Sequence, residues 1–168
     1  MSARPSSSSP LSLKARAIAL LAQREHSATE LRRKLMRIAR ARDQNLQKDG
    51  ASEPAMDPAP EVDALLIWLQ GQGYLNEARF VESRLHARSS RHGNLRIKQE
   101  LAQHGLSLAP EQAAALKDSE LDRARAVWQR KFGEPAQDPA ARAKQTRFLA
   151  GRGFSADVIR RLLRGADQ

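Results

Sequence analysis

The sequence between residues 73 and 106 is GYLNEARFVESRLHARSSRHGNLRIKQELAQHGL, and this stretch decides the fold of the chain. Gly73 can adopt the left-handed turn that ends a helix, and Asn76 then has the short side-chain acceptor that starts the next one. In that helix Ala78, Val81 and Leu85 recur at a spacing that places them on one face. The stretch therefore predicts two helices joined by a short turn.

The same kind of helix end occurs three times along the chain. Each copy has a Leu, a Gly four residues later and then an apolar residue, which can fold back on the last turn. Repetition of this pattern, each time followed by a helix cap, predicts tandem helical modules. The three copies are Leu69–Gly73–Tyr74, Leu101–Gly105–Leu106 and Leu149–Gly153–Phe154, with caps expected at Asn76, Ser107 and Ser155.

Helical periodicity extends over the rest of the chain, and no segment alternates with period two over a useful length. Ser12 can cap the first helix, and Ser27 and Glu30 have the spacing of a capping box. Leu95, with the apolar residues that follow it, is expected to face inward. We therefore expect an all-α protein without strands. Its nine helices should span about 12–24, 27–40, 60–73, 76–91, 94–104, 110–116, 119–132 and 139–151, with the last starting at Ser155.

Two segments differ in composition from these helices. Residues 1–11 are rich in Ser and Pro, and we expect a disordered tail. Residues 41–60 carry three prolines and an excess of acidic residues, which predicts a flexible insertion. The domain organisation that follows is a first module over 12–75 containing the insertion, a second over 76–117 and a third over 118–168.

The charge balance of the 168 residues favours an acidic partner. Lysine and arginine number 29 against 19 aspartates and glutamates, which gives a net charge of +10. The absence of cysteine excludes a disulfide framework and fits a reducing cytoplasm. No apolar run approaches the roughly 20 residues needed to cross a bilayer, and the N-terminus lacks the apolar region of a signal peptide. We expect a cytoplasmic protein that does not bind membranes.

Catalytic signals are missing from the sequence. The four histidines form no HxxxH or HExxH arrangement, and no glycine-rich phosphate loop or G-x-S-x-G elbow occurs. We therefore predict no catalytic, cofactor-binding or metal-binding residues, no cofactor and no enzymatic activity.

Arginine clusters are the stronger signal. Arg84, Arg88 and Arg91 share one helix face at i, i+4 and i+7, and such a stripe is either solvated surface or a binding site for an anionic partner. Further cations follow on the later helices, which suggests a positive side shared by successive modules. The cations that we predict to face an anionic partner are Arg84, Arg88, Arg91, Arg96, Lys98, Arg123, Arg130, Arg147, Arg152 and Arg160.

Four stretches of the chain together are similar to a known family: ALLAQREHSATELRRKL (19–35), QGYLNEARFVESRLHAR (72–88), LRIKQELAQHGL (95–106) and KQTRFLAGRGFSADVIRRLL (144–163). With them the chain resembles the RecX regulatory proteins of bacteria, which modulate the RecA recombinase. The resemblance implies an elongated, curved array of three tandem three-helix repeats. It implies binding along the groove of the RecA–single-stranded DNA filament and inhibition of recombinase, ATPase and co-protease activities. A role in DNA repair, recombination and the SOS response would follow.

The resemblance also implies RecA as the partner of a monomer, with weak direct DNA binding as a second mode. The family's usual glycine exit after the second helix is absent, because residues 38–42 continue as Ile-Ala-Arg-Ala-Arg. A helix-turn-helix DNA-binding regulator is the alternative, and it would concentrate base-reading residues on one helix. Cations spread over several modules favour a long filament. A metal-dependent hydrolase would need a carboxylate or histidine cluster that the sequence does not contain.

Overall fold

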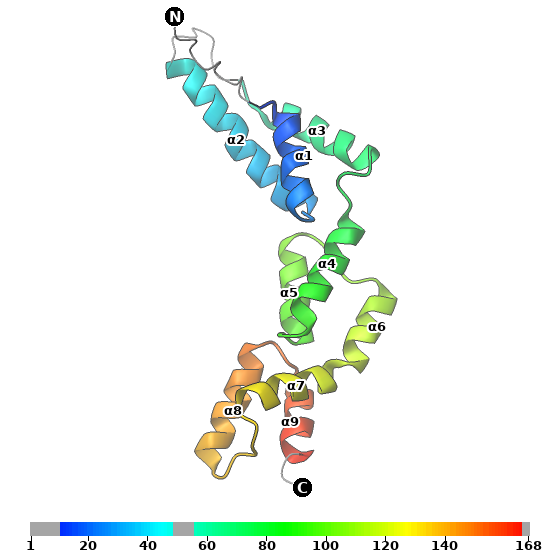
Figure 1. The fold of residues 1–168 in the computed structure, drawn as a ribbon, viewed down its shortest axis with the longest axis vertical. Helices are drawn as coiled ribbons and strands as arrows, with labels where there is room; N and C mark the ends of the chain where they lie inside the picture. Colours follow the sequence, from blue (N-terminus) through cyan, green and yellow to red (C-terminus); the bar gives the residue numbers. More distant parts are fainter. Residues whose placement is uncertain (1–10, 49–55, 166–168) are drawn as a thin grey trace, which may run out of the picture. The chain divides into compact units, whose positions relative to one another are not determined.

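The computed structural model describes residues 11–48 and 56–165, and this part of the chain is helical without strands (Figure 1). The predicted all-α fold with nine helices is confirmed for these residues. The predicted disordered tail lies outside them, apart from Leu11. No helix among the described residues is long and apolar enough to cross a membrane. The helices are α1 Leu13–Gln23, α2 Ala28–Lys48, α3 Ala59–Gly71, α4 Glu77–Ser89, α5 Asn94–Gln103, α6 Pro110–Asp118, α7 Glu120–Lys131, α8 Pro139–Gly151 and α9 Ala156–Gly165.

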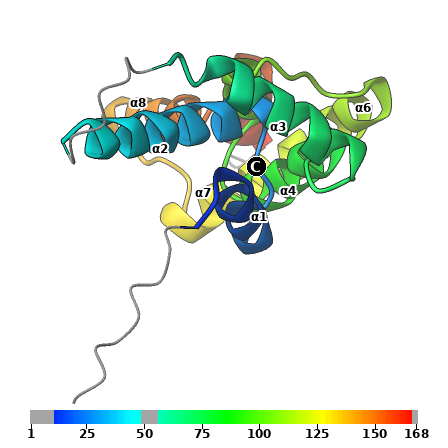
Figure 2. The same ribbon diagram turned by 90° about the horizontal axis from the view of Figure 1, so that it is seen from above.

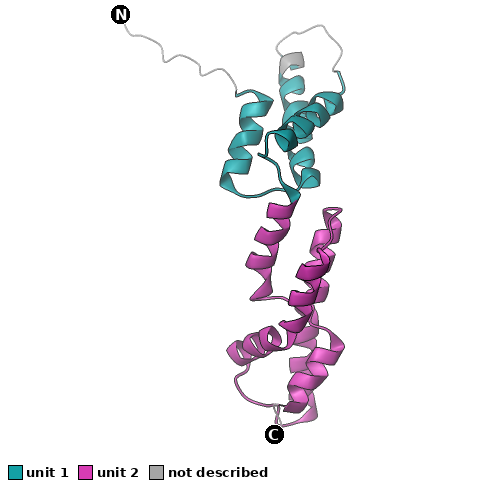
Figure 3. Ribbon diagram, turned by 90° about the vertical axis from the view of Figure 1, so that its right-hand side faces the viewer, with its two compact units in different colours: residues 1–77 teal, residues 78–168 magenta. Residues whose placement is uncertain are grey.

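The chain divides into two compact units, residues 1–77 and residues 78–168, which we call the N-terminal and C-terminal units (Figure 3). In the N-terminal unit α1, α2 and α3 enclose one hydrophobic core. Leu31 and Leu35 of α2 lie one helical turn apart and are fully buried, and Leu69 of α3 packs with them. Figure 2 shows α1 nearly end-on while α2 runs across the view.

The acidic insertion is shorter than the predicted loop 41–60. Helix α2 continues to Lys48, so the predicted loop is wrong over residues 41–48. These residues include no Gly or Pro and are mostly good helix formers. Arg42 also forms an ion pair of 2.8 Å with Glu61 in the first turn of α3, which favours the extended helix. The rest of the predicted insertion includes 49–55, which lie outside the described residues.

The C-terminal unit contains two hydrophobic clusters, each built from three consecutive helices. One joins α4, α5 and α6 around Phe80, Ile97 and Leu101. The other joins α7, α8 and α9 around Trp128 and Leu149. Helical repeats are therefore visible in the packing, while the predicted module boundaries stay a prediction.

The predicted glycine helix ends are confirmed in backbone conformation. Gly73, Gly105 and Gly153 have φ of 74°, 72° and 83°, values that favour glycine over every L-residue. After Gly105 the amide of Leu106 donates to the carbonyl of Leu101 at 3.0 Å, which closes the last turn of α5. Local sequence is therefore enough to predict where these three helices end.

At the first of these helix ends the amide that returns to Leu69 O is that of Leu75, at 3.1 Å, one residue later than in the turn after α5. Tyr74 folds back on the last turn as predicted, because its ring stacks on that of Trp68, with 5.8 Å between ring centres. The extra residue lets Leu75, which is buried, reach the core of the N-terminal unit.

Three predicted caps are confirmed and one is wrong. Ser12, Ser27 and Ser155 each accept, through Oγ, the backbone amide three residues on, at 3.1, 3.1 and 3.4 Å. Ser107 caps no helix, because the chain remains outside a helix through Ala109, and α6 begins at Pro110. The side chain of Gln112 accepts the amide of Ala109 at 3.0 Å in place of the expected serine cap.

The turns before α5 and α9 are joined through their backbones, and we call this contact the junction. The amide of Gly93 donates to Arg152 O at 2.9 Å, and the amide of Leu95 donates to Gly153 O at 3.1 Å. A Cβ on Gly93 would lie 2.3 Å from the carbonyl carbon of Gly153, so only glycine fits. The junction ties the α4–α6 cluster to the α7–α9 cluster.

A buried carboxylate completes the junction. Glu120, in the first turn of α7, is only 5% exposed. Its Oε1 accepts the amide of Asn94 at 3.0 Å and that of Ser155 at 3.3 Å, and Ser155 Oγ donates to Oε2 at 3.3 Å. One negative charge thus lies at the amino ends of both α5 and α9, where the helix dipoles favour it.

Candidate anion-binding interface

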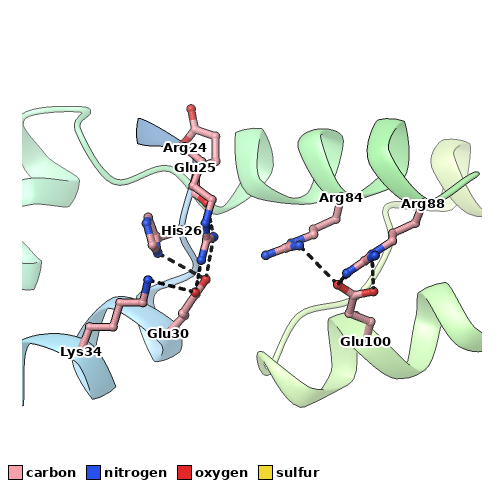
Figure 4. A network of polar contacts seen from close by, with 8 residues as sticks. All are labelled: Arg24, Glu25, His26, Glu30, Lys34, Arg84, Arg88 and Glu100. Atoms are coloured by element: carbon pink, nitrogen blue, oxygen red, sulfur yellow. Dashed lines mark hydrogen bonds and ion pairs between the residues drawn. The ribbon is translucent and has the colours of Figure 1, made fainter. Parts of the chain in front are cut away.

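The predicted cations fall into groups according to what they contact. Arg84 and Arg88 both point toward Glu100 of α5, as Figure 4 shows. Arg84 Nη1 lies 3.5 Å from Glu100 Oε1, and Arg88 Nε lies 3.0 Å from Oε2. The positive charges of Arg84 and Arg88 are therefore bridged by a carboxylate from another helix. Arg91, the third arginine of the predicted stripe, is not part of these two ion pairs.

Arg123 is directed into the protein. Its Nη1 donates to Ser89 O at 3.1 Å and His92 O at 2.7 Å, and its Nη2 donates to Leu116 O at 3.0 Å and to the side chain of Asn94. Burial lowers the pKa of Arg123 from its ordinary value. These contacts give Arg123 a structural role beside the junction.

Four further candidates are exposed on the C-terminal unit. Arg160 lies 3.6 Å from Asp157 on the same helix, a pair open to solvent and therefore weak. Arg96 follows the junction, and a Cβ added to Gly153 would lie 2.5 Å from the Cβ of Arg96. The remaining two exposed candidates are Lys98 on α5 and Arg147 on α8.

Three candidates meet in one place, where a fourth cation that the prediction did not include joins them. The hollow that they line has a volume of about 350 Å³. No carboxylate is among its lining residues in the described part of the chain. We call this hollow the basic pocket; its lining is Arg91, Arg130, Lys131 and Arg152, with Val127 and Phe148 as its apolar part.

Three helix ends position these cations. Arg130 and Lys131 are in the last turn of α7, Arg152 caps the end of α8, and Arg91 follows α4. Arg130 Nη2 donates to Ser90 O at 2.6 Å, and the Arg152 guanidinium lies 5.2 Å from the centre of the Phe148 ring. A helix dipole favours a cation at each carboxyl end. The helix dipole does not explain why four cations from three helix ends line the same hollow.

The environment of His92 shows the local excess of positive charge. The pKa of His92 is lowered first by burial and then by the positive charges of Arg96, Arg152 and Arg88. The His92 side chain therefore favours its neutral form. The region attracts anions and disfavours a further cation.

The N-terminal unit has its own charged cluster, in the stretch that contributed to the family resemblance (Figure 4). Arg24 donates two hydrogen bonds to the carboxylate of Glu30, which also lies 3.6 Å from Lys34 Nζ and 3.3 Å from His26 Nδ1. Hydrogen bonding from Arg24 is the main cause that lowers the pKa of Glu30 to about 2. This cluster fixes the connection between α1 and α2. The carboxylate of Glu30 neutralises part of the positive charge of Arg24 and Lys34.

The basic pocket is suited to hold an oxyanion. Guanidinium groups pair with phosphate or carboxylate oxygens through charge-assisted hydrogen bonds, and a concave arrangement lets several cations reach one group. Lys131 is not among the predicted candidates, although its position beside Arg130 in the last turn of a helix was a usable signal. The apolar part of the lining could not be recognised, because Val127 and Phe148 have the spacing of ordinary core residues.

Comparisons with known proteins agree with this architecture. The family model described as RecX, third three-helix domain, matches residues 118–163, and that described as RecX, second three-helix domain, matches residues 76–109. The chain is 47% identical over 160 residues to "Regulatory protein RecX" of Ralstonia nicotianae, covering 94% of this chain and 90% of the relative. Proteins of the same name from Leptothrix cholodnii and Pseudomonas putida are 46% and 45% identical, covering 94% of this chain in both cases and 90% and 93% of the relatives.

Proposed function

This chain belongs to the RecX family of regulatory proteins, and on that basis we propose that it binds the RecA–single-stranded DNA filament and inhibits the recombinase, ATPase and co-protease activities of RecA. It acts by binding and performs no chemistry of its own. Its role lies in the control of DNA repair and recombination. A helix-turn-helix DNA-binding regulator is disfavoured, because the cations do not concentrate on one recognition helix.

The observation that carries the proposal is the basic pocket. Elsewhere in the described residues many arginines are neutralised by a neighbouring acid, as with Arg32 and Asp63 at 2.7 Å. In the basic pocket four cations converge without a carboxylate in the lining. Such a site favours an anionic partner, and a nucleoprotein filament offers phosphates along its length. We place filament contact at this pocket and at the exposed cations around it.

The test removes two pocket cations whose side chains make no described hydrogen bond within the protein. Arg91→Ala with Lys131→Ala should weaken inhibition of RecA ATPase about 10-fold, since two surface ionic contacts are worth about 1–2 kcal/mol together. The matched control is Arg125→Ala with Arg161→Ala, which removes the same charge from exposed positions outside the pocket. Circular dichroism should show that both variants remain folded.

Salt dependence distinguishes a phosphate contact from a general charge effect. If the two cations contact DNA phosphates, the slope of log affinity against log salt should become shallower by about 0.7 per lost contact. Binding is measured on RecA alone, on single-stranded DNA alone and on the assembled filament. Wild-type inhibition by the pocket variant at every salt concentration, or equal losses in the control, would refute the assignment of the pocket.

We also infer that the protein is a cytoplasmic monomer whose three modules meet near residues 75 and 117. Sedimentation equilibrium over a concentration series checks the oligomeric state, because a monomer keeps one mass throughout. Partial proteolysis checks the first boundary: early cuts should occur in the non-helical residues 72–76 between α3 and α4 rather than within helices.

A further inference from the structure

We propose that a second site on the C-terminal unit binds an acidic, amphipathic polypeptide segment of a partner protein. The site is a groove of about 780 Å³ between α8, α9 and the start of α5. Its apolar lining comes from Leu95, Phe154, Ile159 and Leu163, with small residues of α8 and α9, and we call it the apolar groove. This inference does not depend on the proposed action on RecA.

The apolar groove and the basic pocket lie on different sides of α8. Thr146 and Ala150 of α8 line the groove, whereas Phe148 lines the basic pocket. A helix turns about 100° per residue, so positions two apart point in nearly opposite directions. The two sites share no lining residue, and a substitution in one can leave the other intact.

Leu95 provides the strongest single observation. Its side chain is 60% exposed, although helical periodicity predicts that it faces the core. Its backbone is fixed, because its amide donates to Gly153 O in the junction at 3.1 Å. The groove floor is equally rigid, since Phe154 and Ile159 are buried in the α7–α9 cluster. A large apolar side chain is therefore held in water beside a preformed apolar surface, as in a binding site.

Arginines at the edge of the groove determine the charge of the occupant. Arg142, Arg160 and Arg164 all belong to its lining. Arg142 Nη2 donates to Leu163 O at 3.1 Å, and this hydrogen bond holds the Arg142 side chain across the groove. Arg160 is paired with Asp157, but both side chains are about two-thirds exposed, at 66% and 68%, so a partner carboxylate can compete with this pair.

The combination of apolar floor and arginine edge fits an amphipathic helix with acidic flanks. Apolar residues spaced three and four apart would cover Leu95 and the exposed alanines of the lining, Ala150 and Ala156, and carboxylates beside them would pair with the arginines. A nucleic acid would use the arginines but leave the apolar surface uncovered. The Phe154 ring is 2% exposed and offers no free face for base stacking.

The experiment measures binding of a synthetic peptide to the full chain by fluorescence anisotropy. The probe is a fluorescein-labelled 16-residue helix of about equal Leu and Glu content, and its control carries Lys at every Glu position. The acidic peptide should bind, and the Lys peptide should bind at least 10-fold more weakly. Leu95→Asp and Arg164→Glu should each weaken binding of the acidic peptide about 10-fold. Both positions are exposed, so the fold should persist.

Matched controls are Ile67→Asp, another exposed aliphatic residue, and Arg125→Glu, another exposed arginine. Neither should change peptide binding. Three results would overturn the proposal: equal binding of the two peptides, unchanged binding by both groove variants, or equal losses in the controls. Weakened binding of oligo(dT) rather than peptide by the groove variants would show a nucleic-acid site instead. Loss of a dimer in sedimentation of Leu95→Asp would show that a second copy of the chain occupies the groove.

Discussion

Replacing Gly93 by alanine tests the junction most directly. Gly93 has φ −79° and ψ 171°, which any residue can adopt, so the substitution imposes no backbone strain of its own. The new methyl group would instead lie 2.3 Å from the backbone of Gly153 and from the amide of Phe154. These are backbone atoms of a packed turn, and they cannot move aside without separating the two turns.

The cost follows from what the separation breaks. Two backbone hydrogen bonds cross the junction, Gly93 N to Arg152 O and Leu95 N to Gly153 O. Each buried bond contributes about 1 kcal/mol, and forcing an extra carbon into a packed contact costs at least about 1 kcal/mol more. We expect Gly93→Ala to lower the free energy of unfolding of the C-terminal unit by about 3 kcal/mol. In a unit of this size the midpoint of thermal unfolding should fall by about 12–24 °C.

The assay follows the C-terminal unit by fluorescence. Of the two tryptophans, Trp68 belongs to the N-terminal unit, and Trp128 is buried in the C-terminal unit, where its Nε1 donates to Gln145 at 2.9 Å. In a Trp68→Phe background the remaining signal reports unfolding around Trp128. The matched control is Gly151→Ala, because a Cβ there meets no atom within 4 Å and alanine favours the helix.

The two alanine variants should therefore move in opposite directions. Gly151→Ala should stabilise by about 0.5–1 kcal/mol, and Gly93→Ala should destabilise strongly. A free energy of unfolding for Gly93→Ala within 1 kcal/mol of the parent would refute the idea that the junction requires glycine. It would also show that the α4–α6 and α7–α9 clusters tolerate separation of their turns.

Three further outcomes follow from the described contacts. Gly105→Val should cost about 1 kcal/mol or more in thermal unfolding, because φ is 72° there while the surrounding space is open. The pKa of Glu30 is lowered to about 2, so its stabilising pairing should be complete above its ordinary value of 4.5 and disappear as the pH falls toward 2. Arg24→Ala should therefore move the acid unfolding midpoint to higher pH, which circular dichroism can follow. Glu100→Gln should destabilise by less than about 1 kcal/mol, because its arginine partners are partly exposed, and a neutral amide there should strengthen filament binding at low salt.

The fold was predictable where the signal is local. A glycine such as Gly105 ends a helix through its own conformational freedom, and Ser12 caps one through an atom three residues from its partner. The end of α2 was not predictable in this way. Its extension depends partly on Arg42 meeting Glu61 of the next helix, and that contact becomes visible only when the helices pack.

For the candidate site, the sequence could predict an excess of cations but could not predict which of them are exposed and unpaired. Arg123 and Arg125 are two residues apart and alike in sequence, yet Arg123 donates to carbonyls inside the unit while Arg125 pairs with Asp122 at its surface. Helix spacing correctly placed Arg84 and Arg88 on one face. It could not show that Glu100, on a different helix, lies between them.

The junction also restricts how the array can change in length. In many solenoid proteins a repeat can be lost or duplicated, because each contacts its neighbours through similar surfaces. Here a chain truncated after α6 would leave the Gly93 amide without the Arg152 carbonyl and the Asn94 amide without the Glu120 carboxylate. We therefore expect the last two repeats to unfold together, so that the repeating unit of the sequence is smaller than the unit of folding.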